Sequence, residues 1–431
     1  MDKPDRRSRP ETGWLAFRDV PPCVEETLDN GVHLHIVDNG TMPANRVSII
    51  SGFGTETAAR TTSIPAVSLA SALITEGTTS RSGAEIAANI DFEGAMVNSR
   101  LTEHHSSITV AALNSSLPRL VPVLADIFRN ADFPDHAFRA ARIRSAQRYN
   151  VESTRPAVVA GRLINRLILG ENHPLSAPND ADAIMATSRQ MVAQTHRIIR
   201  DSASAHIFFG GKADKDTIAA LRSLGAGLRP APPASPLVPE ITPPMPEPAG
   251  KHHVAMPESL QTAVAIAIPA IPRNHPDYHN LRLTVMALGG YFGSRLMTKI
   301  REEKGLTYGI GAYLLGNLDG ASVSISAQCP NGTADTVINE ICNEIDALAT
   351  APMPEDELTR LRRYAMSQLI TVLDTPFAIA DYYQCHLLYG TPDTYFEDQF
   401  RAISNLSPET IMNIAATHLL PRQMRIVTAG A

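Results

Sequence analysis

The sequence is poor in cysteine, with only four among 431 residues: Cys23, Cys329, Cys342 and Cys385. They lie far apart, and none belongs to a C-x-x-C pair. This spacing excludes both a small fold framed by disulfides and a zinc knuckle. We therefore expect free thiols, as in proteins of a reducing compartment.

Long apolar runs and concentrated positive charge are also missing. No run approaches the ~18 apolar residues of a membrane-spanning helix. The charged start, MDKPDRRSRPETGW, has no apolar stretch typical of a secretory signal. With 38 Lys and Arg against 44 Asp and Glu, the formal net charge of -6 offers no basic field for nucleic acid. These absences predict a cytoplasmic protein that binds neither membranes nor nucleic acid.

The sequence does contain one dense proline segment, RPAPPASPLVPEITPPMPEPA, at residues 229–249. Proline at that density interrupts helices and strands and favours an extended connector. We therefore expect a Pro-rich linker over residues 229–250 between two domains, 1–228 and 251–431. The length of the chain also favours more than one core.

The two halves repeat one order of apolar patterns. In the first half we expect strands at 32–37, 46–52, 95–101, 106–113 and 205–211, and helices at 64–75, 83–92, 118–130, 135–169 and 188–200. In the second half we expect strands at 262–270, 306–314, 321–328 and 423–430, and helices at 277–288, 293–304, 333–349, 354–373, 376–389 and 408–419. The repeated order predicts an α+β fold of two homologous domains, each a mostly antiparallel sheet packed with helices.

The most informative stretch is GGYFGSRLMTKIREEKGLTYGIGAYL at residues 289–314. It predicts a helix that opens at Ser294 and ends before Gly305, followed by a strand that carries Tyr308. This geometry brings Arg301, one turn from the helix end, close to Tyr308. A guanidinium beside a phenol can bind a carboxylate or a polarised carbonyl. The residue types alone leave open a surface arginine and a tyrosine at the edge of the core.

The pattern GG-x-F-x-SRL-x(4)-RE-x-x-GL-x-Y resembles the C-terminal-domain signature of the pitrilysin/insulinase/mitochondrial processing peptidase family. The arginine and tyrosine of that signature match Arg301 and Tyr308. Three further stretches resemble the family across both halves: EGTTSRSGAEIAANIDFEGAMVNSRLTEHHSSI, LILGENHPLSAPND and IPAIPRNHPDYHNLRLTVMALGG. The resemblance implies a cleft between two halves, one supplying zinc and the facing one supplying the Arg-Tyr pair.

The zinc motif of that family has no counterpart here. In active members the helix before the Gly-Thr-x-x-Arg-Ser turn carries H-x-x-E-H. On this chain the two histidine positions fall on Ser68 and Ala72, the glutamate base on Ser71, and the third ligand, a glutamate, on Arg148. Two hydroxyls, a methyl and a guanidinium cannot replace the imidazoles and carboxylate of a catalytic zinc. The resemblance therefore implies a domain that has lost its metal.

Other chemistry is disfavoured by the spacing of the remaining candidates. The histidines occur in pairs without a third ligand at metal-binding spacing: His33 and His35, His104 and His105 after Glu103, and His252 and His253. Ser68 has no G-x-S-x-G motif around it that would make it a nucleophile.

The resemblance implies a zinc-less subunit of a heterodimeric metallopeptidase, inactive alone and without a cofactor of its own. Arg301 and Tyr308 would bind substrate and stabilise the oxyanion opposite the zinc of a homologous H-x-x-E-H partner chain, during peptide hydrolysis. Two alternatives stay open. One is a non-enzymatic structural or peptide-binding pseudopeptidase, as in the respiratory-complex core proteins that resemble the family. The other is a homodimer that binds peptides without cutting them.

Overall fold

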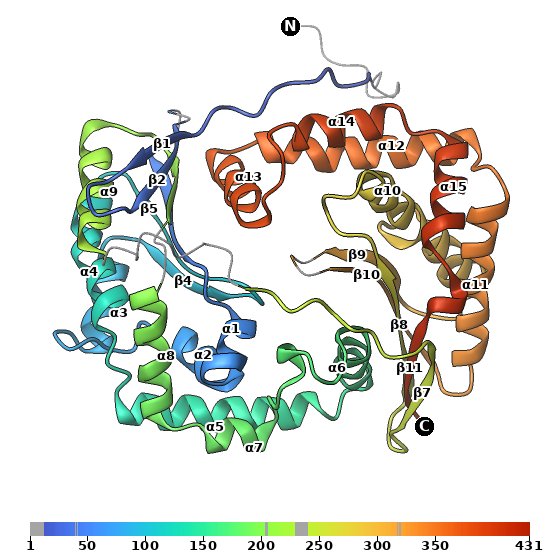
Figure 1. The fold of residues 1–431 in the computed structure, drawn as a ribbon, viewed down its shortest axis with the longest axis horizontal. Helices are drawn as coiled ribbons and strands as arrows, with labels where there is room; N and C mark the ends of the chain where they lie inside the picture. Colours follow the sequence, from blue (N-terminus) through green and yellow to red (C-terminus); the bar gives the residue numbers. More distant parts are fainter. Residues whose placement is uncertain are drawn as a thin grey trace, which may run out of the picture.

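The computed structural model describes residues 13–431 except 39, 41, 203–205, 229–239, 317 and 319. Two sheets lie on opposite sides of the molecule, each with helices on its outer face (Figure 1). No helix in the described part of the chain is long and apolar enough to cross a membrane. All four cysteines are free.

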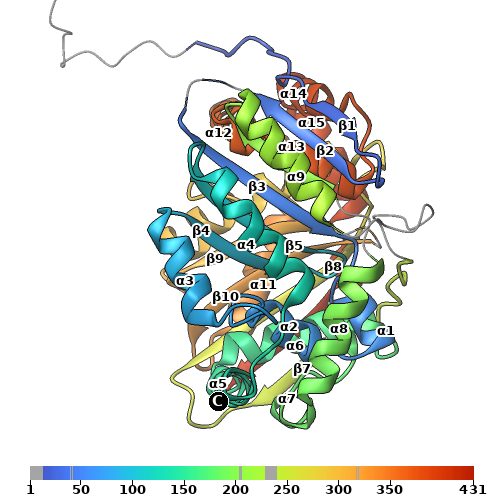
Figure 2. The ribbon, with the colours of Figure 1, turned by 90° about the vertical axis from the view of Figure 1, so that its left-hand side faces the viewer.

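The first sheet, in the described residues, has six strands in the order β1-β2-β6-β3-β5-β4, and β2 and β6 are its parallel pair. The strands are β1 (Val24–Thr27), β2 (His33–Asp38), β3 (Ala44–Ser51), β4 (Met96–Leu101), β5 (Ser106–Leu113) and β6 (His206–Gly211). The helices of this half are α1 (Thr55–Thr61), α2 (Ile64–Ala72), α3 (Gly83–Phe92), α4 (Leu117–Asn130), α5 (Asp135–Glu152), α6 (Pro156–Leu169), α7 (Ala181–Ala186), α8 (Arg189–Ser202) and α9 (Lys215–Gly227), with a 3₁₀ turn at Pro174–Ser176. Figure 2 shows α4 and α9 across the outer face of this sheet, where their apolar side chains form the core of the first half.

The second sheet follows the same plan among the described residues, with the order β7-β11-β8-β10-β9 and β7 parallel to β11. Its strands are β7 (Gly250–Ala255), β8 (Gln261–Ala270), β9 (Ile310–Gly316), β10 (Ala321–Pro330) and β11 (Arg425–Gly430). The helices are α10 (Tyr278–Gly289), α11 (Ala334–Thr350), α12 (Glu355–Ile370), α13 (Pro376–Tyr389), α14 (Tyr395–Ser404) and α15 (Pro408–His418). A π-helical segment, η2, spans Met297–Glu303, and 3₁₀ turns lie at Thr371–Leu373 and Pro421–Gln423. The predicted α+β fold with two mostly antiparallel sheets is confirmed.

One helix of each half packs against the sheet of the other half. Helix α6 packs against β8 and β11, where Ile164 and its neighbours meet a row of small side chains, Ala263, Ala265 and Ala267. The opposite face of β8 carries large aliphatic residues that enter the core of the second half, so the alternation of small and large residues lets α6 lie close to the strand. Conversely, helix α13 of the second half packs against the first sheet through Leu388. Figure 1 shows both helices between the two sheets.

Two expected elements differ substantially from the structure, and a third lies partly outside the described residues. The single helix expected over 135–169 is divided into α5 and α6, because Pro156 begins a new helix and disfavours helical geometry at the preceding residue. The strand expected from 306 begins only at Ile310. Part of the expected linker, 229–239, lies outside the described residues. Residues 240–249 contain no helix or strand and run along α6, where Met245 N–H donates to Leu169 O at 2.9 Å.

Candidate functional site

Arg301 lies in the π-helical segment η2, rather than in the ordinary α-helix expected over 293–304. At its end, Lys304 N–H donates to Lys299 O at 3.2 Å and Leu306 N–H to Ile300 O at 3.0 Å, which widens the last turn. Gly305 follows with φ +61°, the left-handed geometry expected for it. Because π-helical turns are rare and concentrate at functional sites, this segment marks a candidate site.

Tyr308 lies in the tight turn between η2 and β9, and not on a strand. The turn is fixed by Thr307, which is buried and whose Oγ1 lies 2.6 Å from Gln328 O on β10. The same hydroxyl accepts from Gly309 N–H at 3.1 Å. With both neighbours held, the phenol of Tyr308 projects into solvent and is 88% exposed.

The structure brings Arg301 and Tyr308 together, but through the main chain of the tyrosine. Arg301 Nε donates to Tyr308 O at 2.8 Å. The guanidinium carbon lies 5.7 Å from the Tyr308 ring and 5.0 Å from the ring of Phe292. Its Nη nitrogens make no hydrogen bond with described residues, and the carboxylate of Glu302 lies 3.9 Å away. The pair therefore keeps one phenol and one guanidinium edge for a ligand.

A groove of about 410 Å³ lies beside this pair, lined by Tyr291, Phe292, Met297, Tyr313 and the backbone at Gly309. Phe292 and Tyr313 are more than half exposed. The groove follows β9, which is the edge strand of the second sheet. Free edge strands can pair with an extended peptide, whose side chains then enter neighbouring pockets. Aromatic contacts beside a free edge suit a peptide ligand.

The positions of the lost zinc motif lie on α2 and α5. Ser68 and Ala72 are exposed on α2, and Ser71 Oγ lies 2.7 Å from the hydroxyl of Ser99 on β4. Arg148 is exposed on α5, two turns beyond Ala141, which packs against α2. These side chains do not fit a zinc ion, because none is an imidazole, thiolate or carboxylate. Within the described ranges, no group of three or more His, Cys, Asp or Glu could hold a metal ion.

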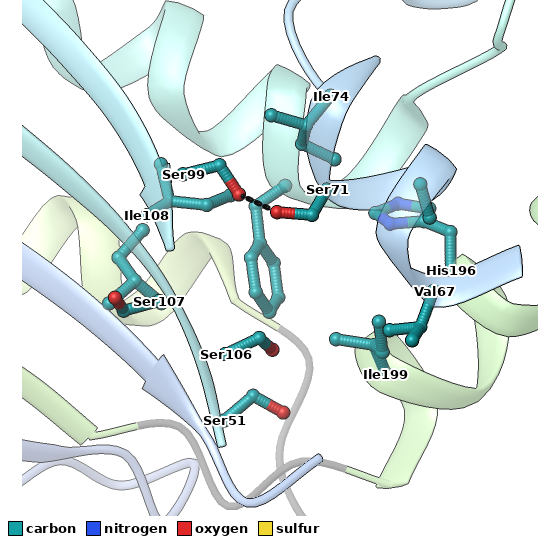
Figure 3. A pocket seen from close by; sticks show the side chains of 13 residues that line it. Ser51, Val67, Ser71, Ile74, Ser99, Ser106, Ser107, Ile108, His196 and Ile199 are labelled. Atoms are coloured by element: carbon teal, nitrogen blue, oxygen red, sulfur yellow. Dashed lines mark hydrogen bonds between the residues drawn. The ribbon is translucent and has the colours of Figure 1, made fainter. Parts of the chain in front are cut away.

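Figure 3 shows the space between α2 and the first sheet, which is hollow but small. The cavity of about 40 Å³ is lined by hydroxyls and apolar side chains, among them Ser51, Ser71, Phe128 and His196. Burial, with the charge of Arg200, lowers the pKa of His196 to about 4. The imidazole is therefore neutral near pH 7, and the cavity has room for a few water molecules.

The turn after α2 has a structural role that the sequence did not reveal. Asp126, on α4, accepts hydrogen bonds from Thr78 Oγ1 at 2.7 Å and Ser80 Oγ at 2.8 Å and pairs with Arg81. Asn130 Nδ2 donates to its other oxygen at 2.7 Å. Burial raises the pKa of Asp126, but these donors outweigh burial and lower it to about 2. The Gly-Thr-x-x-Arg-Ser turn is therefore held to α4 by one ionised carboxylate.

The histidine pairs that lack a third ligand in the sequence contact neighbouring side chains. His33 and His35 share one face of β2 and stack with His206 of β6, and His35 Nε2 lies 2.9 Å from His206 Nδ1. Burial lowers the pKa of His206 to about 3, with a further contribution from His35. His105 lies 2.9 Å from Thr102 Oγ1, and His253 lies 3.0 Å from Thr428 Oγ1.

Comparison with known families gives two matches. Residues 69–177 match the model of insulinase, peptidase family M16, and residues 187–364 match the model of the peptidase M16 inactive domain. The chain belongs to the M16 peptidase family. The family resemblance inferred from the motifs is therefore confirmed, and the two matches together cover about two thirds of the sequence.

The relatives of this M16 chain have low sequence identity to it, but the matches extend over most of both chains. It is 22% identical over 351 residues to an uncharacterized zinc protease of Streptomyces coelicolor, covering 80% of this chain and 76% of the relative. It is 23% identical over 362 residues to an uncharacterized zinc protease of Mycobacterium tuberculosis, covering 83% of this chain and 82% of the relative.

Solved structures share the fold. A peptidase M16 inactive domain from Pseudomonas fluorescens has a TM-score of 0.84 at 20% identity and covers 95% of this chain and 98% of its own. A protease from Helicobacter pylori has a TM-score of 0.84 at 15% identity, covering 96% and 100%. A chain of complex III2 from Candida albicans has a TM-score of 0.73 at 15% identity, covering 94% and 95%.

Proposed function

We propose that this chain is the zinc-less subunit of a heterodimeric metallopeptidase, supplying Arg301 and Tyr308 opposite the zinc site of a homologous partner chain. One contrast carries the proposal. The Arg-Tyr pair is held in place by hydrogen bonds of Arg301 Nε and Thr307 Oγ1, while the phenol and the Nη nitrogens make no hydrogen bond with described residues. The positions that would hold a metal carry two serines, an alanine and an arginine. A partner with an H-x-x-E-H helix would complete the set.

Tyr308 donates the hydrogen bond that the reaction needs. Its phenol is exposed and carries one O–H. During peptide hydrolysis negative charge develops on the carbonyl oxygen of the cleaved bond, and a donor aimed at that oxygen stabilises the transition state. Loss of one such donor costs about 2.7–4 kcal/mol in a well-studied protease. A subunit that supplies it therefore contributes directly to the rate.

Arg301 has two tasks. Its Nε holds the main chain of Tyr308 at 2.8 Å, so it positions the phenol. Its Nη edge, flanked by the rings of Phe292 and Tyr308, binds a carbonyl or carboxylate of the substrate. The peptide lies extended along a sheet edge of the partner, by strand addition, and its side chains face the aromatic groove beside β9.

Reconstitution tests this proposal. We expect the isolated chain to bind no stoichiometric zinc and to cleave no peptide. Co-expression with a homologue that carries H-x-x-E-H should give an equimolar complex on size-exclusion chromatography. That complex should cleave a quenched fluorescent peptide, which neither chain cleaves alone, and its zinc should belong to the homologue.

Metal analysis of the isolated chain is the most direct way to contradict the proposal. About one zinc per isolated chain, retained after mild chelation, would show that this chain has a metal site of its own. Peptide binding without association with an H-x-x-E-H homologue would favour a peptide-binding pseudopeptidase instead.

A further inference from the structure

A cluster of cationic and imidazole nitrogens lies in the second half, at the opposite end of α10 from the groove beside Tyr308. Arg273 is in the loop after β8, and His279 and Arg282 are on the first two turns of α10. Nε of Arg273, Nε of Arg282 and Nδ1 of His279 are all buried and have no hydrogen-bond partner among the described residues. Three such nitrogens in one place call for a ligand, because buried polar groups are normally hydrogen-bonded.

The two guanidiniums have no carboxylate partner within the described residues. Arg273 Nη2 donates to Gly316 O at 3.2 Å, and its guanidinium carbon lies 4.1 Å from the centre of the Tyr389 ring. Arg282 makes no hydrogen bond or ion pair with described residues. Burial lowers the pKa of Arg282. Buried cations without a partner are unfavourable, so an anion at this place would be bound strongly.

Arg273 and His279 line a pocket of about 610 Å³ between the start of α10 and α14, which also exposes Asn280, Tyr395 and Arg401. Arg282 does not line this pocket but lies behind it, close enough to interact electrostatically with Arg273 and Tyr395. The one carboxylate lining the pocket among the described residues, Asp398, accepts from Arg401 Nη1 at 3.1 Å and from Thr394 Oγ1 at 2.7 Å. It is therefore engaged with its own helix. The pocket keeps an excess of positive charge.

The start of α10 adds donors of its own. Asp277 precedes the helix, but its carboxylate accepts from His418 Nε2 at 3.1 Å and does not cap the helix. Tyr278 N–H, at the first position of the helix, donates to His275 O at 3.0 Å. The N–H groups that follow in the first turn lack partners within the helix and carry partial positive charge. Burial, with the charges of Arg282 and Arg273, lowers the pKa of His279 to about 4, so this imidazole is neutral at pH 7. A neutral imidazole donates one hydrogen bond without adding a charge.

We propose that this pocket binds a tetrahedral oxyanion, either free phosphate or the phosphoryl group of a small molecule, against Arg273 and the first turn of α10, with the charge of Arg282 behind it. A phosphate presents several acceptor oxygens that match the forked donors of arginine and the N–H groups of a helix start. A carboxylate presents only two oxygens and would leave donors unsatisfied. This site is separate from Arg301 and Tyr308, so the proposal does not depend on the peptidase role.

Calorimetric titration of the full chain with inorganic phosphate, at neutral pH in chloride buffer, tests the site. We expect saturable binding of one phosphate per chain and a rise in the thermal midpoint that sodium chloride of equal ionic strength does not cause. Arg282→Gln should weaken binding at least tenfold. Because that substitution also removes a buried unpaired charge, the variant should melt no lower than the wild type when phosphate is absent.

Matched variants separate the site from general charge effects. Arg360→Gln removes an arginine already paired with Asp356 on α12 and should leave phosphate affinity unchanged. If Arg282→Gln does not fold, Arg273→Lys keeps the charge, loses the forked geometry and should still weaken binding.

Comparing anions shows whether the site binds free phosphate or a phosphorylated small molecule. Tighter binding of a phosphate monoester than of inorganic phosphate would assign the site to a phosphorylated small molecule, and the reverse order to free phosphate. Binding that does not saturate, equal affinity in Arg282→Gln and the wild type, or tighter binding of acetate than of phosphate would overturn the proposal.

Discussion

Replacing Tyr308 with phenylalanine is the most direct perturbation of the proposed reaction. The substitution removes one hydroxyl that is exposed and keeps the ring. Arg301 Nε bonds to the main-chain oxygen of Tyr308, so this contact survives, as does the ring contact at 5.7 Å. We therefore expect a stability change within ~0.5 kcal/mol, as for other exposed positions.

The kinetic effect should be large by contrast. If the hydroxyl donates to the developing oxyanion, kcat and kcat/KM should fall together by about 10²–10³-fold, which corresponds to about 2.7–4 kcal/mol. If the Nη edge of Arg301 binds substrate in the ground state, Arg301→Ala should raise KM more than it lowers kcat. It should also lower kcat, because Nε no longer holds the turn. The double variant should then lose less than the sum of the two single variants.

The assay is steady-state cleavage of a quenched peptide by the reconstituted complex, with equal subunit ratios checked by size-exclusion chromatography. Zinc content of the partner should stay constant in both variants. Tyr149→Phe, at a tyrosine on α5 that stacks beneath Arg162, is the matched control and should leave the rate unchanged. Activity of Tyr308→Phe and Arg301→Ala within about twofold of wild type would refute the reasoning and favour a structural subunit.

Three further predictions address the metal, the pH dependence and the packing. The quadruple variant Ser68→His, Ser71→Glu, Ala72→His and Arg148→Glu restores the ligands and should create a zinc site visible in metal analysis. Under the proposed function it should still not cleave peptide efficiently as a monomer, because the facing Arg-Tyr pair would have to come from a second chain. The folded pKa of Asp126 lies below its ordinary value of 3.8, at about 2, so its contribution of about 2 kcal/mol is present above pH 4 and lost as the pH falls toward 2. Asp126→Asn should remove that part of the acid dependence in denaturant titrations at several pH values. Ile164→Ala should cost about 2–5 kcal/mol and lower one transition shared by both halves in calorimetry, whereas Ile143→Ala, at an exposed position, should change little.

Elements with complete local signals could be predicted from the sequence. Helix α3 begins and ends where expected, because Ser82 and Glu85 form a capping box at its start. Helix α13 also has the expected bounds, since Thr375 caps it, Pro376 opens it and Gly390 ends it in left-handed geometry. In both helices, the residues that decide the ends are neighbours in sequence.

Elements that depend on distant partners were missed. Strand β7 is mostly exposed and has no apolar alternation, and it is a strand because β11, far away in sequence, pairs with it in parallel. The exchange of α6 and α13 between the two sheets has no local signal either. The contacts of Asp126 have no local signal in the sequence. Neither has the cluster of Arg273 and Arg282, because only the fold shows that no carboxylate among the described residues pairs with these guanidiniums.

The sequence predicted that Arg301 and Tyr308 lie close together, but not which of their atoms interact. A spacing of seven residues around Gly305 was enough to bring Arg301 beside Tyr308. It could not show that the turn, rather than a strand, carries the tyrosine, because Thr307 sets that geometry through its bond to β10. It also could not show that the arginine holds a main-chain oxygen and leaves the phenol free.

This distinction decides which atom carries the functional argument. Arg301 has a structural reason to be present, because its Nε holds the turn. The ring of Tyr308 has one too, since it flanks the guanidinium. The hydroxyl of Tyr308 has none among the described residues: it is exposed, it bonds to no side chain, and phenylalanine would serve the turn equally well. Folding therefore accounts for the phenolic oxygen no more than for the Nη edge of Arg301, and removal of the hydroxyl leaves the fold intact, so it separates an active subunit from a structural one.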